Sequence, residues 1–421
     1  MPFLNALSED ETLKNTSVEK HIVKVLTSAQ ILNGVGVAGT VAAGSLLVSS
    51  ISKSESLAGL AQTSAVLGAA AMALPLSRLT LRGGRRLALS VGYAIGVVGA
   101  LLAIIGGATK ILELMLLGTF LVGAASAAGY QARFAAVDLS TDESRSRQLS
   151  IVVWGSTIGA VAGPNLMQPS GNFAQLLGLP RLVGPYILAI ISLTLATAVI
   201  AFYLKPDPFL TAITLLPPNS LTDAKPSTRS TLKLISKTPS ALFAIVSIAV
   251  GHVVMVSVMV MTPVHMAHVD VTLTIIGIVI SVHVAGMYAF SPLVGYLSDT
   301  LGRKRVIQIG LAILLSAALI AGRSPGNHAF TLGIGLFLLG LGWSCTLIAG
   351  SALLSESVSE ELLPSTQGAS DLIMNLTGAA GGALAGVIIA TMSYGWLCAI
   401  ASIPVIALGI WSLRAKTSQH G

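Results

Sequence analysis

The segment GYLSDTLGRKR (Gly295–Arg305) is a short charged turn between two long apolar runs. It places one acid, Asp299, close to three consecutive bases, Arg303, Lys304 and Arg305. Such a pairing of charges between apolar runs of membrane length is unusual. The runs on either side of the turn therefore decide the fold class.

Composition assigns the chain to the membrane proteins. It has 421 residues, of which 53% are hydrophobic and 10% are charged, and its mean hydropathy is +0.84. Soluble globular proteins carry about 25% charged residues, so this chain has too few to cover a surface in water. Its apolar runs reach or exceed the ~20 residues that cross a bilayer as a helix. We therefore expect an all-α polytopic membrane protein.

Apolar runs between polar breaks predict twelve transmembrane helices. The expected spans are residues 22–49, 57–77, 86–107, 111–137, 148–169, 183–204, 240–263, 271–297, 305–322, 328–354, 366–391 and 394–413. One long polar stretch, rich in Pro, Ser and Thr, separates the sixth span from the seventh. This pattern predicts an N-terminal six-helix bundle (1–204), a central cytoplasmic linker (205–239) and a C-terminal six-helix bundle (240–421).

Basic residues indicate the orientation. Of the 24 Lys and Arg residues, 19 fall in the loops and tails on the side of the N-terminus, 4 fall on the other side, and Arg133 lies within a span. The positive-inside rule then places both termini in the cytoplasm. This bias also explains the pI near 9.5 without a nucleic-acid partner. The N-terminus carries no cleavable signal-peptide pattern, which suits insertion into the cell (cytoplasmic) membrane through the first helix.

The two halves repeat each other at a nearly constant offset of 218 residues. Landmarks that align are Gly84 with Gly302, Arg85 with Arg303, Asp138 with Glu356, and Gly163 with Gly381. Each half has an even number of spans, so both halves share one orientation. They are expected to form two pseudo-symmetric bundles related by an axis along the membrane normal.

The charged turn resembles the loop signature of the major facilitator superfamily, G-x-L-x-D-x-x-G-R-[KR]-x. The resemblance implies a secondary transporter that works by alternating access, with a cytoplasmic gate latched in part by the loop acid. In the first-half copy, Leu81 stands at the aspartate position. We assign to the gate Gly295, Asp299, Gly302, Arg303, Lys304, Gly84, Arg85, Arg86, Asp138, Arg145, Arg147, Arg133 and Glu356.

The fifth span carries GSTIGAVAGPN (Gly155–Asn165), which resembles the antiporter signature of that family. Gly159, Gly163 and Pro164 match the signature G-x-x-x-G-P-x-x-G-G, whereas its terminal glycine pair is absent. Glycines four apart let two helices approach closely, and a proline bends its helix. The resemblance is to the 12-helix drug/proton antiporter branch and implies export, while close packing with no bearing on direction remains the alternative. The fourth span also lacks the arginine that exporters of the family often carry.

Ionisable groups within spans are expensive and usually functional. Asp371, His252 and His283 are the candidates for proton coupling, because a histidine titrates near neutral pH and a carboxyl group shielded from water does so too. In the alternative interpretation, each histidine bonds a backbone carbonyl, and Asp371 pairs with a loop base or caps local structure. We favour Asp371 as the proton site.

Polar side chains within spans are candidates for lining a cargo cavity, together with one aromatic residue. They are Gln30, Asn33, Gln62, Gln131, Asn165, Gln168, Asn375 and Trp343. The spans hold no cluster of Arg or Lys that would bind a strongly ionic cargo. A small, largely apolar molecule is therefore the expected cargo.

The sequence accordingly predicts a secondary active transporter, acting as a monomer in the lipid bilayer, that moves a small molecule in exchange for protons. We expect no cofactor, because no G-x-x-x-x-G-K-[ST] phosphate loop occurs, so the proton gradient is the expected energy source. No metal site is expected, and no enzyme activity, since the chain lacks H-E-x-x-H and any recognisable pair of nucleophile and base. A proton-coupled importer or a uniporter of the same fold remains open, as does a membrane-embedded enzyme or receptor from another class.

Overall fold

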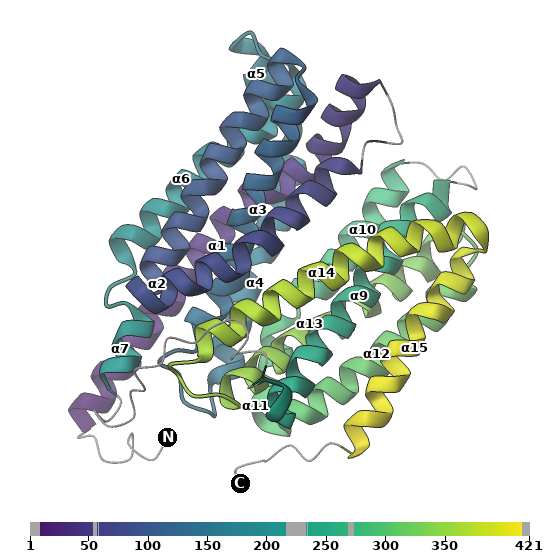
Figure 1. The fold of residues 1–421 in the computed structure, drawn as a ribbon. Helices are drawn as coiled ribbons and strands as arrows, with labels where there is room; N and C mark the ends of the chain where they lie inside the picture. The colour runs from purple at the N-terminus through teal and green to yellow at the C-terminus, as the bar shows by residue number, and fades with distance from the viewer. Residues whose placement is uncertain are drawn as a thin grey trace. The chain divides into compact units, whose positions relative to one another are not determined.

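The computed structural model describes residues 9–53, 57, 59–215, 233, 235–267 and 273–414. Regular secondary structure in these ranges is helical (Figure 1). The helices are α1 (Glu9–Ser52), α2 (Leu60–Thr109), α3 (Leu112–Ala135), α4 (Arg145–Asn165), α5 (Met167–Leu176), the short 3₁₀ helix η3 (Arg181–Val183), α6 (Gly184–Tyr203), α7 (Pro208–Thr214), α9 (Pro239–Ala267), α10 (Leu273–Tyr288), α11 (Ser291–Leu301), α12 (Arg303–Arg323), α13 (Ala329–Glu356), α14 (Leu363–Thr391) and α15 (Tyr394–Arg414).

Ten of the described helical segments are long and apolar enough to cross a membrane. An eleventh span results if the bent pair α4 and α5 is counted as one. The 50-residue helix α2 covers two predicted spans, 57–77 and 86–107. With α2 counted as two crossings, the described helices are consistent with the predicted twelve spans.

The continuity of α2 differs from the expected loop between the second and third spans. The loop was expected because four arginines lie between Arg78 and Arg86, but arginine is a good helix former. Helical geometry is interrupted at Gly84, whose φ is 82°. Gly302, which separates α11 from α12, has φ 95°. Only glycine enters this region of φ without a steric cost, which explains the glycine at this position in both copies of the loop.

The chain divides into two compact units. The first comprises Met1–Asp142, Ile151–Pro226 and Glu360–Leu372, and the second comprises Glu143–Ser150, Ser227–Ser359 and Ile373–Gly421. The first unit thus includes the start of α14, and the second includes the start of α4. The predicted linker, 205–239, opens with α7, while residues 216–232 and 234 lie outside the described residues.

In the first unit, α2 packs along α3 and α1 packs along α6 (Figure 1). Its core is built from fully buried side chains such as Leu26, Leu89, Tyr93 and Leu193. In the second unit, α13 packs against α9, α10 and α12, and α12 also contacts α15. Helix α13 is buried on nearly every side, which suits its uniformly apolar sequence.

Close contacts at glycines confirm the internal repeat. A Cβ atom on Gly68 would collide with the Phe120 carbonyl, and one on Gly286 would collide with the Phe337 carbonyl. Gly123 in α3 and Gly340 in α13 likewise face backbone atoms of the neighbouring helix. Each half therefore joins its helices through glycines at equivalent positions.

Candidate functional site

A buried ion pair in the first unit joins two segments far apart in the chain. The Arg133 guanidinium of α3 donates a hydrogen bond of 2.6 Å to the Asp371 carboxylate of α14. Their side chains are 2% and 1% exposed. The guanidinium also lies 4.7 Å from the centre of the Phe134 ring and 5.7 Å from that of Tyr130. Aromatic faces stabilise a cation at these distances, so the two rings support the guanidinium beside the Asp371 carboxylate.

A second buried pair lies nearby in the same unit. Arg85 donates two hydrogen bonds to the Asp138 carboxylate, at 2.8 and 2.9 Å, and a third of 2.7 Å to Gln367 Oε1. Gln367 lies one helical turn before Asp371 on α14. Arg85 and Asp138 were both predicted for the cytoplasmic gate, and the structure brings them together. Arg133, predicted for the same group, has its closest ionic partner in Asp371.

Asp207 holds the start of the helical segment that follows Gly84. Its carboxylate accepts hydrogen bonds from the backbone N–H groups of Arg85 (3.2 Å) and Arg86 (2.8 Å). It also accepts one from Leu210 at the start of α7. The first turn of a helix has unpaired N–H groups and favours negative charge. Asp207 therefore supplies an acid that the first-half loop, with Leu81, lacks.

In the second unit, the signature loop supplies its own acid. Asp299 accepts hydrogen bonds from the backbone N–H groups of Ser146 (3.0 Å) and Arg147 (2.9 Å) in the first turn of α4. Arg303 lies 3.0 Å from the Asp299 carboxylate and 2.7 Å from that of Glu356. Arg303 and Glu356 are 53 residues apart, as are Arg85 and Asp138. The ion pairs of the two units thus repeat each other.

Other residues assigned to the gate lie around these contacts. Gly295 faces Ser150, and a Cβ atom there would collide with the Ser150 hydroxyl. Arg145 is buried, and Lys304 is half-buried beside Arg303 at the start of α12.

The antiporter-like motif packs α4 against α1 within the first unit. Gly159 faces the backbone of Gly34, and Gly163 faces Ala38 and Gly39. The Pro164 side chain lies outside the described residues, but its position coincides with a 56° bend between Arg145–Gly163 and Met167–Leu176. The expected close approach and the expected bend are therefore present.

The candidates for cavity lining separate into groups. Gln30 and Asn33 of α1 meet α3 and α4: Gln30 donates a hydrogen bond of 2.9 Å to Ser156, and both amides lie against Gly129. Gln131 is buried and donates to the Ala73 carbonyl. Asn375 is buried on α14 in the second unit. The exposed candidates are Gln62, Asn165, which donates to its own helix at Val161, and Gln168.

The two histidines of the second unit differ in their surroundings. His283 is fully buried, and its Nδ1 lies 2.8 Å from the Leu336 carbonyl, which is the structural role given above as the alternative. His252 Nδ1 accepts a hydrogen bond of 3.1 Å from the Trp343 indole, whose ring meets Tyr288 edge to face. His252 therefore belongs to a small aromatic cluster with Trp343 and Tyr288.

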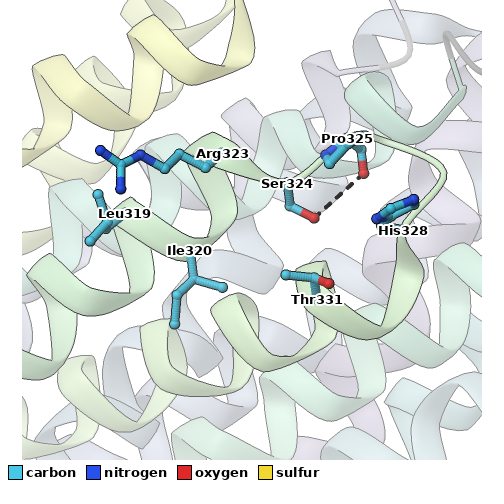
Figure 2. Close-up of a pocket in the computed structure, with 7 residues that line it drawn as sticks. All are labelled: Leu319, Ile320, Arg323, Ser324, Pro325, His328 and Thr331. Carbon is cyan, nitrogen blue, oxygen red and sulfur yellow. Dashed lines mark hydrogen bonds between the residues drawn. The ribbon is translucent and has the colours of Figure 1, made fainter.

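A separate cavity of about 370 Å³ lies between the end of α12 and the start of α13. Figure 2 shows its lining residues, with the Ser324 hydroxyl directed toward the Pro325 carbonyl. Arg323 and His328 are exposed at its edge. None of the residues predicted for the site lines this cavity, so we assign it no part in transport.

Sequence reasoning missed Gln367, Asp207 and Tyr130. Asp207 had a local signal, because an acid followed by proline is a common start of a helix. Gln367 and Tyr130 had no comparable signal in the sequence. Gln367 lies one helical turn before Asp371, and Tyr130 lies one turn before Arg133.

Comparisons with known proteins agree with this architecture. The model of the Major Facilitator Superfamily matches residues 26–274 and 253–421. The uncharacterised MFS-type transporter YdeG of Bacillus subtilis is 37% identical over 408 residues, which cover 95% of this chain and 93% of YdeG. The riboflavin transporter RfnT of Brucella anthropi is 25% identical over 416 residues, covering 96% of this chain and 98% of RfnT.

A solved structure has the same fold. The crystal structure of a bacterial homologue of the iron transporter ferroportin matches with a TM-score of 0.72 at 13% identity, covering 93% of this chain and 98% of that one. At this identity the structural match shows a shared fold alone. Membership of the family rests on the family model and on the similarity to YdeG. The chain therefore belongs to the major facilitator superfamily of membrane transporters and is not an enzyme.

Proposed function

We propose that this transporter exports a small, largely apolar molecule in exchange for protons, and that Asp371 carries the proton. The observation that supports the proposal is the buried pair of Asp371 and Arg133, 2.6 Å apart and almost fully shielded from solvent. Charges at membrane depth are retained mainly where they serve function. A carboxylate that can be discharged by a proton is the simplest such function.

Protonation of Asp371 changes the contact between α3 and the start of α14. A charge-assisted hydrogen bond is roughly twice as strong as a neutral one, so discharge of the carboxylate weakens the tie to Arg133. The contact between α3 and α14 would then have two states, with and without the ion pair, and binding of a proton shifts the equilibrium between them. Gln367 lies one turn before Asp371 on α14 and accepts a hydrogen bond from Arg85, so it connects the same stretch of α14 to the second ion pair.

The charge balance supports a cargo without strong charge. Arg85 is paired with Asp138, and Arg133 with Asp371. These buried pairs are neutral as a whole and leave no surplus charge for an ionic cargo. Export is supported by the antiporter-like glycines Gly159 and Gly163, which lie in close contact with α1.

A second candidate is import of a vitamin-like molecule by proton symport. It is favoured by the similarity to RfnT, a protein named for riboflavin, over nearly the whole chain. Both candidates place the transporter in the cell membrane with both termini in the cytoplasm. Reporter fusions at each terminus test that orientation, and activity of an extracytoplasmic reporter at either terminus would contradict it.

The decisive assay is uptake into inside-out vesicles under an imposed pH gradient, with a panel of lipophilic dyes and riboflavin. If the protein is an exporter, the wild type should take up cargo when the vesicle interior is acidic, and a protonophore should abolish this uptake. Asp371→Asn is expected to remove the gradient dependence. Uptake only in right-side-out vesicles would favour import, and an unchanged gradient dependence in Asp371→Asn would refute the role of Asp371.

The control is Asp138→Asn, which neutralises an equally buried acid of the same unit. It also leaves an arginine, Arg85, without its carboxylate, and removal of one partner of a buried pair is strongly destabilising. We therefore expect a lower rate with the gradient dependence retained. A second control, Arg133→Gln combined with Asp371→Asn, removes both charges and separates loss of the proton site from the effect of an uncompensated cation.

A further inference from the structure

The amide groups of Gln30 and Asn33 form a small uncharged cluster in the first unit. They lie three residues apart on one face of α1, near the middle of the span predicted there. A point one bond from the Gly129 Cα, where a Cβ atom would lie, is 2.5 Å from Asn33 Nδ2 and 3.2 Å from Gln30 Oε1. The absence of a side chain at Gly129 therefore gives the two amides their space.

The cluster has unused hydrogen-bonding capacity. Asn33 is 6% exposed, and neither its Oδ1 nor Gln30 Oε1 accepts a hydrogen bond within the described part of the chain. Gln30 uses its other amide atom on Ser156, and the Thr157 hydroxyl next to Ser156 is also unpaired there. Buried polar groups are normally paired, and an unpaired one is costly. The cluster is thus suited to a polar partner that comes from outside the chain.

The chemistry of that partner follows from the amides. Each primary amide offers an oxygen that accepts and an NH₂ group that donates, and the two can exchange places by rotation. A ligand edge that carries a donor beside an acceptor fits either orientation. Such an edge is found in cyclic amides and imides, where N–H adjoins C=O, and it carries no charge.

We propose that Gln30 and Asn33 recognise the cargo through a neutral cyclic amide or imide edge. The proposal rests on the transport function proposed above, and it narrows the class of cargo to apolar ring systems that carry this edge. A polar edge in an otherwise apolar ligand fixes its orientation and specificity, as is usual in small-molecule sites.

The cluster also lies close to the ion pair. Gly129 and Arg133 are four residues apart on α3, so they share a face and are separated by a rise of about 6 Å. A cargo bound at the amides therefore lies about one helical turn from the group that pairs with Asp371. In this proposal, the cargo site and the ion pair both adjoin α3, through Gly129 and Arg133 respectively.

The test is binding of two probes to the full chain in lipid nanodiscs, without a pH gradient. The probes are 1,8-naphthalimide, which has the imide N–H, and N-methyl-1,8-naphthalimide, which lacks it. We expect the N–H compound to bind about 10-fold more tightly, a ratio that corresponds to about 1.4 kcal/mol. Gln30→Met and Asn33→Leu, which keep side-chain size, are each expected to lower this ratio to about 1–2 by removing the amide partner.

Gln175→Met is the matched control, because Gln175 is an exposed amide of α5 outside the cluster, and it should keep the ratio. Gly129→Ala retains both amides but fills the space beside them, and it should weaken binding of the N–H probe. Equal binding of the two probes, no saturable binding of the N–H probe, or an unchanged ratio in both Gln30→Met and Asn33→Leu would each overturn the proposal. Since no gradient is used, failure here leaves proton-driven export intact, and failure of export leaves this binding result intact.

Discussion

The ion pair of Arg133 and Asp371 is open to a double-mutant cycle on stability. Asp371→Asn leaves the Arg133 cation buried beside a neutral amide. Two unit charges about 4 Å apart attract by about 4 kcal/mol at an effective dielectric constant of 20, and breaking a buried pair costs about 3–5 kcal/mol. We expect Asp371→Asn to lower the free energy of unfolding by about 4 kcal/mol and Tm by roughly 10 °C on the scale of units of about 200 residues.

The double variant Arg133→Gln with Asp371→Asn should be far less affected. Both charges are removed together, and replacing a whole buried pair by neutral groups is often close to neutral in stability. Its free energy of unfolding should lie within about 1–2 kcal/mol of the wild type, which gives an interaction energy of at least about 2 kcal/mol. Glu113→Gln on the same helix is the matched control, since Glu113 is exposed and its change should stay within about 0.5 kcal/mol.

The assay must report on the first unit. Both cysteines, Cys345 and Cys398, are buried in the second unit, so a thiol-reactive dye would follow only that unit. We therefore replace both by alanine and introduce Ala100→Cys, at a fully buried position of α2. The cycle is completed by Arg133→Gln alone. If the losses of stability in Asp371→Asn and Arg133→Gln add up to the loss in the double variant, or if Asp371→Asn shifts Tm by less than about 2 °C on the same scale, the pair does not hold the unit together and the reasoning is wrong.

Three further predictions concern the backbone. Gly302→Ala forces a side chain into φ 95° and should cost about 1–2 kcal/mol in thermal unfolding, whereas Gly333→Ala, in a helix with open space beside it, should be neutral or stabilising; equal effects would contradict the strain argument. Asp207→Ala removes the carboxylate that caps two helix starts and should cost about 1–2 kcal/mol, and an unchanged Tm would exclude that role. Gly159→Ala brings a Cβ atom into contact with the Gly34 backbone and should lower stability by about 1–3 kcal/mol through overpacking. It should also slow transport into vesicles, and a normal transport rate would contradict the need for this close approach.

The sequence predicted those features that repeat or that follow from local chemistry. The offset of 218 residues aligned Arg85 with Arg303 and Asp138 with Glu356, and the structure pairs the members of each half across 53 residues. The glycine of the charged turn was predicted from the family signature, and its positive φ gives the physical reason. Such features can be predicted from the sequence because the two halves carry equivalent residues at equivalent positions.

The partner of Asp371 was not accessible in this way. Arg133 and Asp371 lie 238 residues apart, and no pattern of period or spacing connects α3 with α14. The local context of Arg133, near the end of a span and close to Asp138, pointed instead to the loop charges. Pairing across the chain depends on how helices pack, and a single sequence does not contain that information. Asp207 was missed for a related reason, since it caps a helix 121 residues earlier.

The amide cluster of α1 lies against Gly129 of α3, one helical turn from Arg133 of the ion pair, so the sign of the coupling between cargo and proton can be tested by binding alone. Linkage is reciprocal: if protonation of Asp371 changes cargo affinity by some factor, cargo changes proton affinity by the same factor. Exchange of cargo for protons requires that the two binding events oppose each other, whereas symport requires that they support each other. Asp371→Asn resembles the protonated acid, so it should weaken binding of 1,8-naphthalimide in an exporter and strengthen it in a symporter. The same nanodisc titration therefore separates the two functions, and an affinity unchanged by Asp371→Asn would mean that the cluster and the pair are not coupled.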